Sequence, residues 1–153
     1  CEHFPVMPVL SSFLQREGAV LDYRKYLGQA GEDYACRFIE EQGLEVLERN
    51  WRDSNRGELD ILAREGNTAV VVEVRTRVGI GYGSALESID TRKVLKLRRL
   101  AAQWARQRRL FSKLRIDIIA LTVPRACGQE LREGGTVDFL RYPPKIEWLR
   151  GIA

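Results

Sequence analysis

The sequence predicts one mixed α/β domain, in which a sheet of about five strands is flanked by helices in the order α-β-β-β-α-β-β. Three observations support this prediction. Residues 57–77 alternate apolar and polar side chains on either side of Gly66-Asn67, as a β-hairpin does. A helical apolar stripe lies between Asp90 and Asp117, and residues 114–123 are again strongly β-forming. A chain of 153 residues with 44% hydrophobic content suits one domain with one core.

Each element follows from a local pattern. In chain order we predict a helix at 27–43, strands at 44–49, 57–64 and 68–77, a basic helix after Asp90, and strands at 114–123 and 136–142. Gly43 ends the first helix, and Pro143-Pro144 ends the last strand. A Gly/Glu-rich loop is expected at 128–135.

The same patterns divide the chain into three parts. We expect residues 1–23 to be an N-terminal extension, residues 24–142 to be the folded domain and residues 143–153 to be a C-terminal tail. No apolar run approaches the roughly 20 residues that span a membrane, and the N-terminus lacks the pattern of a signal peptide. We therefore expect no membrane partner.

The predicted hairpin brings acidic side chains together. Gly66-Asn67 suits a type II′ turn, and in the register that it fixes Asp60 faces Glu73 and Glu58 faces Arg75. The other face pairs apolar residues: Ala63 with Val70, Ile61 with Val72 and Leu59 with Val74. Two directly opposed residues have Cβ atoms roughly 5 Å apart, and unit charges at that spacing repel by about 3 kcal/mol at an effective dielectric constant of about 20. The pair therefore favours a cation or a shared proton between the two acids.

A structural interpretation of the hairpin is also open. The hairpin could be half exposed, with solvated charges and with Glu58–Arg75 and Glu73–Arg77 as surface ion pairs. Against this, Leu62 and Val71 flank the acids and suggest partial burial. A register shift of one residue would move the acids to opposite faces and remove the metal site.

Composition limits the chemistry of such a site. The single histidine, His3, lies near the terminus, which argues against a histidine-rich zinc site or a Ser-His-Asp triad. Cys1, Cys36 and Cys127 are odd in number and lack CxxC spacing, which favours a reducing, cytoplasmic location. A metal would then be held by oxygen ligands, which selects Mg²⁺ or Mn²⁺.

The basic helix suggests a polyanion partner. The formal net charge is +4, and no acid lies between Asp90 and Asp117. Helical spacing places Val94, Leu97, Ala101, Trp104 and Ala105 on one stripe, and Arg92, Lys96, Arg99, Gln103 and Arg106 on another. Such a cationic edge favours nucleic acid, although a solvated helix face is the ordinary alternative and a membrane-surface helix a lesser one.

Five segments match one known family. They are GQAGEDYACRFIEEQG, LEVLERNWR, GELDILAREGNTAVVVEVRTR, YGSALESIDTRKVLKLRRLAAQW and LRIDIIAL. On these segments the chain resembles the YraN-like family of predicted bacterial endonucleases, related to archaeal Holliday-junction resolvases and the PD-(D/E)xK nuclease superfamily. The resemblance covers residues 24–142 and implies a restriction-endonuclease-like sheet.

The resemblance implies a metal-dependent endonuclease that acts on branched or single-stranded DNA and, because resolvase relatives work as dimers, a homodimer. It implies these catalytic residues: Glu32, Asp60, Glu73 and Arg75. The Mg²⁺ or Mn²⁺ ligands would be Asp60, Glu73, the Val74 carbonyl and Glu32, with Glu58 in a supporting position. Together with the basic helix, it suggests these nucleic-acid-binding residues: Arg77, Arg92, Lys93, Lys96, Arg99 and Arg106.

Arg75 departs from the lysine usual in the superfamily. Arginine stays protonated in proteins and cannot act as a general base, although it can bind a phosphate. Catalysis would then be slow, or would depend on Lys93 or a second metal. A non-catalytic nucleic-acid-binding module that retains the nuclease fold is the alternative.

Overall fold

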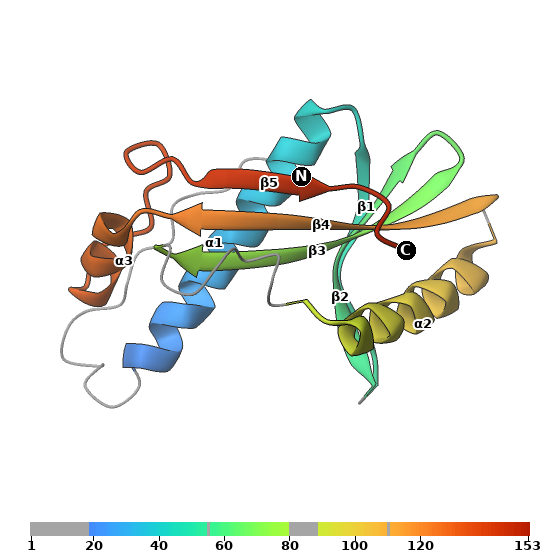
Figure 1. The fold of residues 1–153 in the computed structure, drawn as a ribbon, viewed down its shortest axis with the longest axis horizontal. Coiled ribbons are helices and arrows are strands. Elements are labelled where there is room, and N and C mark those ends of the chain that lie inside the picture. The colour runs from blue at the N-terminus through green and yellow to red at the C-terminus, as the bar shows by residue number, and fades with distance from the viewer. Residues whose placement is uncertain (1–18, 55, 80–88, 110) are drawn as a thin grey trace.

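A computed structural model describes residues 19–54, 56–79, 89–109 and 111–153 (Figure 1). The elements are α1 (Ala19–Glu41), β1 (Glu45–Asp53), β2 (Gly57–Glu65), β3 (Thr68–Val78), α2 (Thr91–Arg108), β4 (Lys113–Val123), α3 (Arg125–Arg132) and β5 (Lys145–Leu149). The sheet order is β1-β2-β3-β4-β5; β3 and β4 are parallel and the other neighbours antiparallel. The mixed α/β fold with a five-stranded sheet flanked by helices is therefore confirmed.

Helices α1 and α2 cover opposite faces of the sheet. Side chains alternate across a strand, so Val70 and Val72 of β3 pack with Ile39 of α1, whereas Val71 packs with Trp104 of α2. In Figure 1, α1 runs diagonally across the strands and α2 lies near the C-terminus. Full burial of an aliphatic side chain stabilises a fold by about 1.5–3 kcal/mol, so both helices are held mainly by these apolar contacts.

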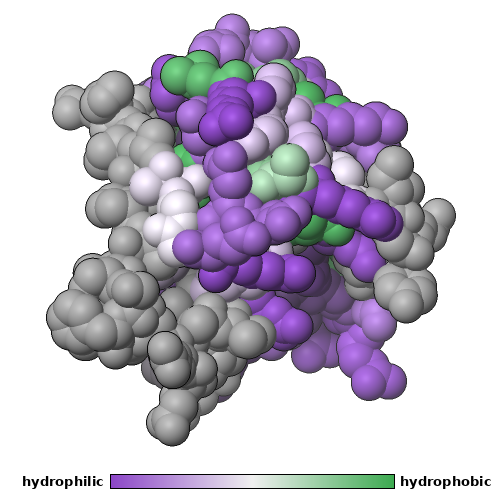
Figure 2. All heavy atoms as spheres, turned by 90° about the vertical axis from the view of Figure 1, so that its left-hand side faces the viewer, coloured by the Kyte–Doolittle hydropathy of each residue, from purple (hydrophilic) through white to green (hydrophobic). Residues whose placement is uncertain are grey.

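Helix α3 lies at the opposite end of the sheet from α2 (Figure 1). It packs against α1 through a third apolar cluster made of Leu27, Val123, Cys127, Leu131 and Val137. Figure 2 views the molecule from this end and shows mainly hydrophilic residues, with a few scattered apolar ones, among those described. This end therefore presents a polar surface.

The hairpin has the predicted register from the turn as far as Ile61 and Val72. Gly66 has a φ of 60°, as the first central residue of a type II′ turn requires, and Glu65 pairs with Thr68. The ladder continues to the pair formed by Ile61 and Val72. The turn and register were predictable because they depend only on neighbouring residues.

Strand β2 departs from simple alternation at Asp60. Leu59 packs with Leu62 and with Leu100 of α2, although alternation placed it on the face of Ile61. The predicted pairing of Leu59 with Val74 is therefore wrong. From Asp60 back to Gly57, β2 stays paired with β1 but no longer pairs with β3. This separation changes the face to which the β2 side chains point.

The predicted strand at 136–142 is wrong. The Asp138 side chain accepts hydrogen bonds from the backbone N–H groups of Leu140 and Arg141, both at 3.0 Å, and so forms a turn. The last strand is β5, which follows Pro143-Pro144 directly and pairs with β4. The proposed C-terminal tail at 143–153 thus contributes a strand to the sheet.

Two other expectations need correction. The loop expected at 128–135 is largely helix α3, because Cys127 and Leu131 bury one helical face. Helix α1 begins at Ala19, before the predicted residue 27, and most of the proposed extension at 1–23 lies outside the described residues. None of the described helices is long and apolar enough to cross a membrane.

Candidate functional site

Asp60 and Glu73 meet where β2 and β3 separate. The Asp60 carboxylate accepts a hydrogen bond from the Val74 backbone N–H at 2.9 Å, which satisfies a donor that β2 no longer pairs. Glu73, the preceding residue of β3, is 7% exposed. Its pKa is raised to about 8, first by burial and then by the charge of Asp60 and a hydrogen bond with it. The separation of the strands therefore brings the two predicted acids into contact.

Two cations approach Glu73. The Lys93 ammonium of α2 lies 3.7 Å from Glu73 Oε2, and Arg75 follows Glu73 by two residues on β3. Both lower the pKa of Glu73, but less than burial and Asp60 raise it. Arg75 Nε is buried and has no hydrogen-bond partner among the described residues. The site thus combines two acids with two cations, one of which retains an unsatisfied donor.

Glu32 lies beside this pair, on α1. It is 9% exposed, and its pKa is raised by burial and by Asp60, while Arg49 lowers it. Arg49 of β1 donates to Glu32 Oε1 from Nε at 3.2 Å and from Nη2 at 3.0 Å. Glu32 is therefore near Asp60 but already bound to arginine.

The predicted metal ligands converge only in part among the described residues. Among them, no group of three or more His, Cys, Asp or Glu side chains lies close enough together to hold a metal ion. The structure brings together Asp60, Glu73 and the Val74 backbone, whereas Glu32 is bound by Arg49.

Burial raises the pKa of the Cys36 thiol to about 12, which makes this thiol a poor metal ligand or nucleophile.

Glu58 does not pair with Arg75 as predicted. Its carboxylate lies 2.9 Å from Arg52 of β1, its partner across the β1–β2 ladder. The reason is again the separation of β2 from β3 beyond Ile61. Glu58 therefore lies outside the contacts of the acid pair.

Helix α2 presents the predicted cationic edge. Its buried residues are Leu97, Leu100, Ala101 and Trp104. The predicted contact residues Arg92, Lys96, Arg99 and Arg106 are exposed, as is Arg98, whereas Lys93 is half-buried. Asp90 caps the helix by accepting from the Lys93 backbone N–H at 2.8 Å, which fixes the first turn beside Glu73. Arg77 instead lines a cavity that it shares with Asp60 and Glu32.

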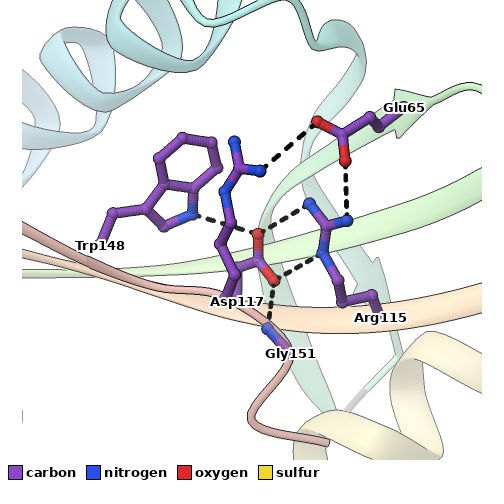
Figure 3. Close-up of polar contacts among 6 residues, drawn as sticks. Glu65, Arg115, Asp117, Trp148 and Gly151 are labelled. Carbon is purple, nitrogen blue, oxygen red and sulfur yellow. Dashed lines mark hydrogen bonds and ion pairs between the residues drawn. The ribbon is translucent and has the colours of Figure 1, made fainter.

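Sequence reasoning missed Asp117, which is fully buried in β4. It accepts hydrogen bonds from Arg115, the Trp148 indole and the Gly151 backbone (Figure 3). Arg115 also donates to Glu65 at 2.8 Å. Because its oxygens are fully engaged, Asp117 is a structural residue that joins β4, β5 and the end of β2. The sequence showed only an acid in a β-forming stretch.

Sequence reasoning also missed Tyr23, Arg24 and Arg132, which line the same cavity as Asp60. No local signal could reveal them, because α1 and α3 meet only in the tertiary structure.

A model of the uncharacterised protein family UPF0102 matches residues 31–121 of this chain. The match includes Glu32, Asp60 and Glu73 and the whole of α2. The chain belongs to the UPF0102 family. A UPF0102 protein of Paenarthrobacter aurescens is 37% identical over 134 residues, which cover 87% of this chain and 98% of the relative. One from Rhodococcus opacus is 44% identical over 98 residues, 63% of this chain and 82% of the relative.

Gly31 sets the distance between α1 and β3 beside this site. A β-carbon at Gly31 would collide with Thr76 Oγ1, whereas one at Gly28 would meet nothing within 4 Å. We expect Gly31→Ala to lower the free energy of unfolding by about 1–3 kcal/mol, because overpacking shifts the helix. The control Gly28→Ala should raise it by up to about 1 kcal/mol, as alanine favours a helix. Urea unfolding of both variants checks this; equal effects would contradict it.

Proposed function

We propose that this UPF0102 protein is a metal-dependent endonuclease that cleaves branched or single-stranded DNA. The observation that carries the proposal is the contact of two carboxylates, those of the buried Glu73 and the half-buried Asp60, at the point where β2 and β3 separate. Such a pair costs free energy unless a cation or a proton lies between the acids. Lys93 and Arg75 beside it suit a reaction in which negative charge develops on a phosphate.

The residues fit Mg²⁺ or Mn²⁺. These ions take oxygen ligands and are often held by one or two carboxylates together with water and substrate phosphate. Asp60 and Glu73 would supply the carboxylates, and the Val74 carbonyl is the further ligand that we propose. When bound, the ion would lower the pKa of a water molecule and polarise the phosphate.

The other residues of the site have separate tasks in this proposal. Arg75 cannot accept a proton, so its task is to bind the phosphate and offset charge in the transition state. Lys93 Nζ, 3.7 Å from Glu73, would position that carboxylate and neutralise part of its charge. Arg49 holds Glu32 at 3.0 Å, which leaves Glu32 to act on the site through its charge.

A non-catalytic DNA-binding module is the second candidate. Two observations favour it: Arg75 stands where a lysine would be expected, and three carboxylates do not converge among the described residues. Such a protein would use the cations of α2 to bind the phosphate backbone without cutting it.

An assay with labelled duplex, flap, four-way junction and single-stranded DNA separates the two candidates. We expect cutting with Mg²⁺ or Mn²⁺, none with EDTA, and a loss of more than about 100-fold in Asp60→Asn, since even outer-shell partners of metal ligands contribute about 10–100-fold. The exposed Glu45, paired with Arg64 at 2.8 Å, provides the control Glu45→Gln, which should cut normally. Tight binding without product under either metal would favour the binding module.

A further inference from the structure

A cavity of about 590 Å³ lies between the N-terminal half of α1, the C-terminal half of β3 and α3. Glu32, Asp60 and Val74 line it, so the cavity opens onto the acid site. Arg24 and Arg132 line it as well. Arg24 precedes Glu32 by two helical turns, which is about 12 Å along α1. The cavity therefore runs from cationic residues to the carboxylates.

The two arginines are available to an anion. Both are exposed, and neither forms an ion pair with a carboxylate of the described residues. The Arg132 guanidinium lies 4.8 Å from the centroid of the Tyr23 ring, a cation–π contact that holds it over the cavity. Glu32 and Asp60 are the acids among the lining residues, and both belong to the site itself.

The size and position of the cavity select the ligand. Clefts of about 300–1,000 Å³ hold ligands the size of small molecules, so this cavity admits one strand but not a double helix. Phosphates follow each other at about 3.4 Å along a stacked strand, so a few nucleotides span the distance from Arg24 to Glu32. Helix α2 covers the opposite face of the sheet, and its exposed cations Arg92, Lys96 and Arg99 can contact a duplex there.

We propose that this cavity binds the phosphates of a single nucleic-acid strand through Arg24 and Arg132 and leads that strand to Asp60 and Glu73. The inference rests on the proposed nuclease function, since it takes Asp60 and Glu73 as the site of cleavage. It narrows the substrate to DNA with an unpaired strand, such as a flap or a single strand.

Binding without divalent metal tests the cavity separately from catalysis. The probes are a labelled oligothymidylate and a duplex of equal length, titrated in EDTA at several salt concentrations. For Arg24→Ala/Arg132→Ala we expect about tenfold weaker binding of the oligothymidylate and a salt slope lower by about 1.4, or 0.7 for each lost phosphate contact. Duplex binding should change less than twofold.

The control is Lys25→Ala/Arg37→Ala, which removes two exposed cations of α1 that do not line the cavity. It should bind both probes as the unmodified protein does. The inference fails if the cavity variant and the control bind the oligothymidylate alike, or if the unmodified protein does not bind it. Cutting is measured separately with Mn²⁺. If strand binding depends on the cavity but no DNA is cut, the nuclease proposal alone is refuted. If DNA is cut but the cavity variant binds the strand as well as the unmodified protein does, the cavity proposal alone is refuted.

Discussion

Replacing Glu73 with glutamine is expected to stabilise the metal-free protein at pH 8 by about 2–4 kcal/mol and to lower metal-dependent cutting by more than about 100-fold. Both effects come from one feature, a buried carboxylate held beside Asp60. Glutamine removes the charge and keeps the shape. The residue that the reaction needs would thus be one that weakens the fold.

The direction of the pH effect follows from proton binding. The pKa of Glu73 is raised from 4.5 to about 8 in the folded protein. Between these values the folded state holds a proton that the unfolded state has released, so stability falls as pH rises through this range. Each pKa unit is worth about 1.4 kcal/mol, which sets the upper bound, and sharing of the proton with Asp60 reduces it.

Urea unfolding at pH 5 and pH 8 in EDTA measures the effect. The stability difference between Glu73→Gln and the unmodified protein should grow between the two pH values, whereas Glu45→Gln, at an exposed position, should change little. Mg²⁺ should stabilise the unmodified protein at pH 8 and not Glu73→Gln, because a ligand stabilises only the state that binds it. A difference that does not depend on pH would rule out Glu73 as the titrating group.

The parts of the site that the sequence predicts are those fixed by local geometry. A two-residue turn at Gly66-Asn67 sets the hairpin register as far as Ile61 and Val72. Asp60 and Glu73 are the next residues of the two strands, and they are in contact. Helical spacing likewise predicts which face of α2 is buried. These predictions need no knowledge of the rest of the chain.

The sequence-based predictions fail where contacts between residues far apart in the chain determine the structure. Glu58 pairs with Arg52 because β2 leaves β3 to follow β1, which hairpin alternation cannot show. Residues 136–142 have the composition of a strand, but the Asp138 side chain bonds the backbone and forms a turn. Arg132 reaches the cavity only through the packing of α3 on α1. Such features depend on tertiary contacts that override local preference.

Asp117→Ala is expected to lower the free energy of unfolding by about 3–5 kcal/mol, the usual cost of removing one partner of a buried ion pair. Asp117 is fully buried, 2.9 Å from Arg115 Nε and 3.1 Å from Trp148 Nε1. The Gly151 backbone N–H donates to it at 2.8 Å. Alanine would leave these donors without their acceptor and create a cavity.

In Asp117→Ala the loss of stability should appear first at the edge of the sheet formed by β5. Trp148 belongs to β5, and Gly151 follows it, so Asp117 joins these residues to β4 (Figure 3). Hydrogen exchange in β5 should therefore accelerate more than exchange in the β2–β3 hairpin, where the acid pair lies. Local opening of β5 would leave the contact between Asp60 and Glu73 intact.

Two further variants show whether the loss of stability in Asp117→Ala comes from the hydrogen-bond network of Asp117 and not from its charge alone. Asp117→Asn keeps one acceptor oxygen for Trp148 or Gly151 but loses the ion pair with Arg115, so we expect an intermediate loss. Glu45→Ala removes an exposed ion pair and should cost less than about 1 kcal/mol. If Asp117→Ala cost no more than Glu45→Ala, the buried carboxylate would contribute nothing beyond a surface charge, and β5 would be held by its backbone pairing and apolar contacts alone.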